Sequence, residues 1–193
     1  MKKFLKQKNN GFTLLETLVG LSIFTVSILA MMSVLASGIS DTNYAQKKII
    51  AGYLNQEGIE YIRNMRDTYA FFDVNVDSRQ RWTDFKNRLF EARCDGEFGC
   101  YIDDSVLVKG DNKMQPIKDL KLIDCGEICA NILYDPVTGK YGFVSGEDSG
   151  FSRKISIELI NDDEIKVRST VSWVQGSGNS SVTFSERLYN WAE

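Results

Sequence analysis

The sequence predicts an α+β chain in which one long N-terminal helix packs on a C-terminal antiparallel β-sheet. Three observations predict this fold. Residues 12–40 hold a single charged side chain, Glu16, an apolar stripe at helical spacing continues over 41–66, and the last 43 residues contain runs of alternating apolar and polar side chains. The averages over all 193 residues are those of an ordinary domain, with 43% hydrophobic and 25% charged residues and a formal net charge of −3.

The composition excludes several kinds of chemistry. The chain has no histidine, so it can build neither a Ser-His-Asp or Cys-His catalytic arrangement nor a histidine-ligated zinc or haem site. Two prolines in the whole chain exclude a proline-rich linker or tail. We therefore expect no catalysis by the mature protein, no cofactor and no metal.

The run from Phe12 to Ala36 is long enough to cross a bilayer, which takes about 20 apolar residues. A secretory signal peptide would have a shorter apolar core, of about 7–15 residues, followed by a cleavage site with small residues. Four lysines precede the run, at positions 2, 3, 6 and 8. By the positive-inside rule the N-terminus is then cytoplasmic, and residues after about 40 lie outside the membrane.

The helical pattern continues beyond the apolar run. An apolar line recurs at multiples of four, interrupted by Glu57, and comprises Ala45, Ile49, Tyr53, Tyr61 and Met65, with Ile50, Leu54 and Ile62 beside it. One helix from Phe12 to Arg66 would hold about 55 residues and would be roughly 80 Å long. Its second half should pack on a domain through this stripe.

A polar loop from Asp67 to Gln80, with an aromatic cluster at Tyr69, Phe71 and Phe72, is predicted to follow. The apolar positions Trp82, Phe85, Leu89 and Phe90 then predict a short helix over 82–93, with Thr83 or Asp84 as its cap. Short strands are predicted at Ser105–Val108, Leu120–Asp124, Ala130–Tyr134 and Tyr141–Val144.

Three longer alternating runs near the C-terminus predict an antiparallel meander with one buried face. The buried face is predicted to hold Ile155, Ile157 and Leu159 in the first run, Ile165, Val167, Ser169, Val171 and Trp173 in the second, and Val182, Phe184, Glu186 and Leu188 in the third. The amphipathic half of the long helix is the element that would cover this face.

A carboxylate four residues inside an apolar helix needs an explanation. Insertion of an ionised group at a helix centre costs about 2.5–3.5 kcal/mol, and less near the end, so Glu16 indicates a specific partner. The sequence Gly11-Phe12-Thr13-Leu14-Leu15-Glu16, after a basic leader and before an apolar helix, resembles the signal of type IV pilins and pseudopilins.

This resemblance implies a pathway for the protein. A prepilin peptidase would cut between Gly11 and Phe12 and methylate the new amine of Phe12, and an inner-membrane assembly platform would then add the subunit to a filament. Glu16 would pair with the Phe12 amine of a neighbouring pilin or pseudopilin subunit. Before assembly the apolar half would lie in membrane lipid.

The implied organisation has four parts. They are a leader over 1–11, a membrane and filament-core half-helix over 12–40, an amphipathic half-helix over 41–66, and an extracytoplasmic β domain over 67–193. Major pilins usually have proline near the twenty-second mature position, where this chain has Ser33. The ending Val171-Ser172-Trp173 and Leu188-Tyr189-Asn190-Trp191 resembles that of minor pilins of the PilV type and of I-type secretion pseudopilins.

These features favour a minor pilin or pseudopilin of a type IV pilus or type II secretion filament. A major pilin is one alternative. A membrane-anchored enzyme or receptor domain, whose N-terminus only resembles the signal, is the other.

The remaining candidate sites involve cysteines and acidic runs. Cys94-x5-Cys100 and Cys125-x3-Cys129 do not form the usual pair of zinc-binding spacings, so two disulfides are expected outside the membrane. Three connectivities are possible, and we expect the local pairing of Cys94 with Cys100 and of Cys125 with Cys129. Calcium is the alternative for the acidic runs 103–104, 147–148 and 162–164, which we interpret as solvated loops. Without the leader lysines the chain has 19 basic and 26 acidic residues, so we expect no nucleic acid partner.

Overall fold

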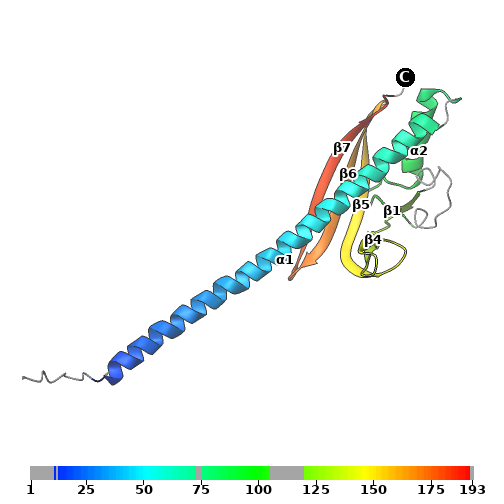
Figure 1. The fold of residues 1–193 in the computed structure, drawn as a ribbon. Coiled ribbons are helices and arrows are strands. Elements are labelled where there is room, and N and C mark those ends of the chain that lie inside the picture. The colour runs from blue at the N-terminus through cyan, green and yellow to red at the C-terminus, as the bar shows by residue number, and fades with distance from the viewer. Residues whose placement is uncertain (1–10, 12, 73–74, 105–119, 192–193) are drawn as a thin grey trace, which may run out of the picture. The chain divides into compact units, whose positions relative to one another are not determined.

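The structure, a computed structural model, describes residues 11, 13–72, 75–104 and 120–191. The chain divides into two compact units, residues 1–45 and residues 46–193. Helix α1 (Leu14–Phe72) begins in the first unit and ends in the second (Figure 1). All described residues of the first unit are exposed to solvent, whereas the second unit contains the hydrophobic core.

The predicted long helix is confirmed, but it ends later than expected. The sequence placed a polar loop from Asp67 onward, and the structure continues α1 to Phe72. Local contacts support the additional turn, since the Thr68 hydroxyl donates to the Asn64 carbonyl at 2.7 Å and Arg66 pairs with Asp67 at 2.6 Å. Tyr69 packs against the core, so the last turn of α1 still has an inner face.

The buried face of α1 differs from the predicted stripe. Ile49 and Tyr53 are 60% and 68% exposed, and Ala45 is exposed as well, whereas Leu54, Ile62 and Met65 are buried as expected. A helix has 3.6 residues per turn, so each step of four advances about 40° beyond a full turn, and a line at multiples of four leaves the buried face. The observed face comprises Ala51, Leu54, Asn55, Gly58, Ile59, Ile62 and Met65.

Helix α2 (Ser78–Glu91) confirms the predicted short helix and begins four residues earlier. Trp82, Phe85 and Leu89 are buried, as their spacing indicated. The predicted caps were wrong, because Asp77 is the N-cap and its carboxylate accepts from the Arg79 backbone N–H at 2.9 Å.

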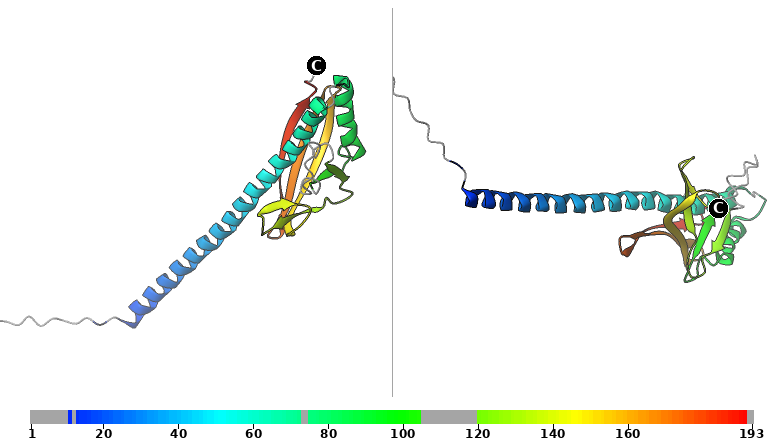
Figure 2. Two further views of the ribbon diagram at one scale, coloured as in Figure 1. Left: turned by 45° about the vertical axis from the view of Figure 1, so that its right-hand side comes forward. Right: turned by 90° about the horizontal axis from the view of Figure 1, so that it is seen from below.

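Three long strands form the predicted antiparallel meander (Figure 2). They are β5 (Glu147–Asn161), β6 (Glu164–Gln175) and β7 (Gly178–Tyr189). The face predicted for β6 is buried at all five positions from Ile165 to Trp173. Leu159 is the exception on β5, since it is 50% exposed near the turn that joins β5 to β6.

Shorter strands complete the sheet on the other side of β5. They are β1 (Cys100–Asp103), β2 (Lys121–Asp124), β3 (Asn131–Asp135) and β4 (Lys140–Gly142). β1 pairs with β2 and meets β5 at Ile155, while β3 pairs with β4 and with the start of β5. Strand β1 was not predicted, and the predicted strand at Ser105–Val108 lies outside the described residues.

The inner face of the sheet packs against α1 between Ile50 and Tyr69, which confirms the predicted α+β arrangement. The larger core cluster joins Ile62 and Met65 of α1, Phe85 of α2, and Ile155 and Val167 of the sheet. A second cluster surrounds Leu54, Phe151 and Trp173.

Candidate processing and assembly site

Helix α1 starts at Leu14, three residues after Gly11 of the predicted cleavage position. The Thr13 hydroxyl accepts a hydrogen bond from the Glu16 backbone N–H at 3.2 Å, and the Thr13 carbonyl accepts from the backbone N–H of Glu16 at 3.0 Å and of Thr17 at 3.1 Å. Thr13 is therefore the helix cap. Thr13-Leu14-Leu15-Glu16 also fits the capping-box pattern, which sequence reasoning missed.

Glu16 lies in the first turn of α1 and is exposed to solvent. A carboxylate in this turn is favourable, because the first backbone N–H groups of a helix carry partial positive charge. Gly11 is exposed, and Phe12 and the four leader lysines lie outside the described residues.

The surface that follows Glu16 is apolar on all sides. Leu18, Leu21, Phe24 and Leu35 are each between 63% and 68% exposed. Within the described residues, α1 is the one helix that is long and apolar enough to cross a membrane. Exposed apolar area of this extent is not stable in water, so this half of the helix requires lipid or other protein around it.

Buried polar contacts join the second half of α1 to the sheet. Arg153 of β5 is 2% exposed, and its guanidinium donates to the Leu54 carbonyl at 3.0 Å and to the Glu57 carboxylate at 2.7 Å. Burial raises the pKa of the Tyr61 hydroxyl and of the Asp104 carboxyl, and the charge of Glu57 raises both further. This cluster fixes the position of α1 on β5.

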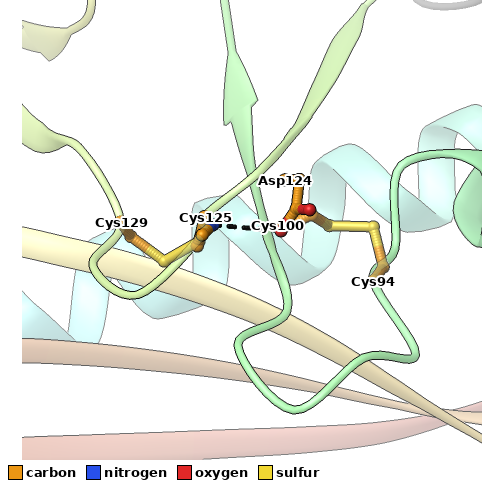
Figure 3. Close-up of a disulfide and its surroundings, with 6 residues drawn as sticks. Cys94, Cys100, Asp124, Cys125 and Cys129 are labelled. Carbon is orange, nitrogen blue, oxygen red and sulfur yellow. Dashed lines mark hydrogen bonds between the residues drawn. A yellow bond between two sulfur atoms is a disulfide. The ribbon is translucent and has the colours of Figure 1, made fainter.

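The four cysteines form two disulfides, Cys94–Cys100 and Cys125–Cys129, which is the local pairing that we expected among the three possible connectivities (Figure 3). Helix α2 positions the first of them. Arg93 follows the helix with φ of 54°, the Arg93 N–H bonds the Phe90 carbonyl, and the Cys94 N–H bonds the Leu89 carbonyl. This Schellman-type end turns Cys94 into the core.

Each acidic run contains an aspartate that accepts a hydrogen bond from another part of the domain. Their interpretation as simple solvated loops was therefore incomplete. Asp104 accepts from the Phe143 backbone N–H at 3.1 Å, and Asp163 accepts from the Asn190 side chain at 3.1 Å. Asp148 accepts from the Gly150 N–H at 2.8 Å, and this bond lowers the pKa of the Asp148 carboxyl. Within the described residues, no three His, Cys, Asp or Glu side chains are grouped so as to hold a metal ion.

Comparison with known proteins identifies the class of the N-terminal segment. Residues 6–39 match the family model for the prokaryotic N-terminal methylation motif, so the chain carries a type IV pilin-like prepilin signal. The match includes both Gly11 and Glu16. It supports a pilin or pseudopilin that is processed by prepilin peptidase, anchored in a membrane and located in a pilus or pseudopilus. No curated protein and no solved structure matches the chain.

Proposed function

We propose that this protein is a minor pilin or pseudopilin, the structural subunit of a type IV pilus or a type II secretion filament. The observation that carries the proposal is the match of residues 6–39 to the methylation motif at the start of an exposed apolar helix. Prepilin peptidase cuts after Gly11 on the cytoplasmic side and methylates Phe12. The domain from Gln46 onward lies on the other side of the membrane.

Assembly then exchanges lipid contacts for protein contacts. The apolar half of α1 leaves the bilayer and packs among the helices of other subunits. Glu16 pairs with the methylated amine of a neighbouring Phe12, since each charge alone is costly in a low-dielectric bundle and the two stabilise each other when close. This pairing sets the position of each incoming subunit.

Two sequence features support a minor subunit. Ser33 stands at the twenty-second mature position, where major pilins of this signal type usually have proline, and the C-terminal motif resembles that of PilV-type minor pilins and I-type pseudopilins. The mechanism in either filament is structural.

The test must separate the pairing of Glu16 from its place in the first turn of the helix. Glu16→Gln removes the charge and keeps a residue that suits a capping box, whereas Thr13→Ala removes the cap and keeps the charge. We expect Glu16→Gln and Glu16→Ala to be cleaved normally and to lose about tenfold or more of the filament-incorporated fraction, since removing one partner of a buried charge pair leaves the other charge uncompensated, at a cost of about 3–5 kcal/mol. Thr13→Ala should incorporate far better than either.

The measurement compares sheared filaments with membranes by quantitative immunoblotting of the full-length chain. Normal incorporation of Glu16→Gln would contradict the pairing role. Equal losses in Thr13→Ala and Glu16→Ala, with Glu16→Gln unaffected, would assign Glu16 to the helix start.

A further inference from the structure

Strand β7 forms a long open edge of the sheet. Among the described residues, β7 pairs with β6 alone, and the ladder between them continues over all 12 residues of β7 without a register shift. Figure 1 shows β7, in red, at the outer side of the sheet. A long and regular edge strand presents a row of unpaired backbone groups, so it is a template for pairing with another chain.

The turn between β6 and β7 determines which backbone groups of β7 point away from the sheet. Gln175 pairs with Gly178 across a two-residue turn, so these two residues form a hydrogen-bonded pair. Hydrogen-bonded and non-hydrogen-bonded pairs alternate along an antiparallel ladder. The outward N–H and C=O groups are therefore those of Asn179, Ser181, Thr183, Ser185 and Arg187.

Most of β7 lacks the features that usually block a free edge. The segment Gly178–Ser185 contains no charged residue and no proline, and its ladder with β6 has no bulge. The charged side chains of the strand follow at Glu186 and Arg187. Helix α1 approaches β5 and β6 most closely at Gly58, so it lies against the inner face of the sheet and leaves this edge uncovered.

A groove of about 850 Å³ lies between the β7 edge and α1. It is lined by two of the outward-facing residues of β7 and by side chains of α1, which include Thr183, Ser185, Tyr53, Gln56, Glu60 and Arg63. The buried Asn55 donates to the Val182 carbonyl at 2.8 Å, which fixes β7 relative to α1. The edge and the groove are thus preformed, so a segment that pairs with β7 need not order them on binding.

The charges in this groove define the chemistry of its partner. Arg63 pairs with two carboxylates, Glu60 at 2.5 Å and Glu186 at 2.6 Å, so the carboxylates exceed the guanidinium by one negative charge. Tyr53 is 68% exposed in the same groove, and the face of a tyrosine ring attracts a cation. An added strand with a lysine or arginine on its inner side would complement both groups.

We propose that β7 receives an extended basic segment of a partner protein, which adds a strand to the sheet. Backbone hydrogen bonds to Ser181, Thr183 and Ser185 hold the segment, and a lysine or arginine on its inner side lies in the groove beside Glu60 and Tyr53. The inference goes beyond the proposed assembly through the apolar half of α1, because it concerns a different surface and a different kind of contact.

Photo-crosslinking of the full-length chain in its native cells tests this strand addition. A photoreactive amino acid replaces Ser181, Thr183 or Ser185, one at a time, and mass spectrometry identifies the partner residue that it captures. Val137, which is 91% exposed on the β3–β4 turn, is the control position. We expect the three β7 positions to capture one segment that contains lysine or arginine. The captured residue should move by about two positions for each step of two along β7, because paired strands have a similar rise per residue.

Two pairs of variants separate the backbone contact from the charge contact. Thr183→Pro removes an outward N–H and no bond to β6, whereas Thr183→Val keeps the N–H. We expect Thr183→Pro to lower the adduct yield at positions 181 and 185 about tenfold and Thr183→Val to leave it unchanged. Glu60→Lys should lower the yield by a similar factor because it repels a basic segment, and Glu147→Lys, the same change at an exposed acid outside the groove, should not. Disulfide mapping checks that each variant folds.

The results that would overturn the strand addition are equally specific. They are adducts scattered over several surfaces, a yield at β7 no higher than at Val137, or a yield that survives Thr183→Pro or Glu60→Lys. Adducts on β7 of a second copy would also overturn it and would assign the edge to a contact between copies. A mature chain that still begins at Met1 would contradict the proposed function and leave the result at β7 intact.

Discussion

At the scale of single residues, two glycines of α1 differ in how closely the sheet approaches them. A Cβ on Gly58 would lie 2.8 Å from the Ser169 hydroxyl and 3.1 Å from Ile155, both on the sheet. A Cβ on Gly52 would meet only Phe184, at 3.9 Å, which is an ordinary contact. Gly58 thus permits the close approach of α1 to β5 and β6, and Gly52 has no such function.

Alanine substitution at the two positions should give stability changes of opposite sign. We expect Gly58→Ala to lower the free energy of unfolding by about 1–3 kcal/mol through overpacking. Gly52→Ala should raise it by up to about 1 kcal/mol, because alanine is the better helix former. Thermal unfolding of the full chain in detergent measures both. Equal effects at the two positions would mean that helix propensity, not packing on the sheet, determines the result.

At the scale of residues, the sequence alone indicated the N-terminal signal, but it did not indicate the backbone conformation of individual residues in the domain. Gly11 and Glu16 have fixed places in a linear pattern, so they could be read directly. The positive φ of Arg93 could not be predicted from the sequence, because glycine usually occupies that conformation. The chain reversal at Arg93 is stabilised by the buried Cys94 and by the strands packed around it. The Thr13 cap was readable from Thr-x-x-Glu and was missed.

At the scale of elements, one buried charge joins α1 to the sheet in addition to the two hydrophobic clusters. Arg153 reaches α1 through Glu57, and the Tyr61 hydroxyl donates to the other oxygen of the same carboxylate at 3.3 Å. Glu57 interrupts the apolar line in the sequence, so it looked like an exception to the stripe. In the structure it is the partner of a guanidinium from the facing sheet.

Replacing Glu57 alone should lower the free energy of unfolding more than replacing Glu57 and Arg153 together. We expect Glu57→Gln to lower the free energy of unfolding by about 2–4 kcal/mol, because it leaves a buried guanidinium without its anion. The double variant Glu57→Gln with Arg153→Met should be more stable than Glu57→Gln alone. Chemical unfolding followed by tryptophan fluorescence compares them. A double variant whose loss equals the sum of the two single losses would show that the groups act independently.

Elements with strong periodicity were predictable, and short ones were not. The alternation in β5 to β7 gave the correct buried face, because one face of each strand meets the helix layer along most of its length. Strand β1 has four residues and is stabilised by pairing with β2 and with Ile155, which are distant in sequence. The end of α1 was misplaced because Asp67 and Thr68 are polar, although Tyr69 still contacts the core.

At the scale of the whole molecule, the average composition combines two units that differ in solvent exposure and in charge. The described residues of the first unit are exposed and mostly apolar, and the second unit has an ordinary core and carries nearly all of the acidic groups. Removal of the predicted leader would take away four lysines and leave 19 basic and 26 acidic residues. The end of the membrane and filament half at residue 40 stays a prediction.

The central claim is that residues 1–11 are a leader that prepilin peptidase removes. The most direct test is the N-terminal residue and intact mass of the protein isolated from its native membrane. We predict a chain that begins at Phe12 with a methylated amine, together with a Gly11→Leu variant that retains the leader because the cleavage site no longer fits a narrow cleft. A mature protein that still begins at Met1, in place and in normal amount, would contradict the account.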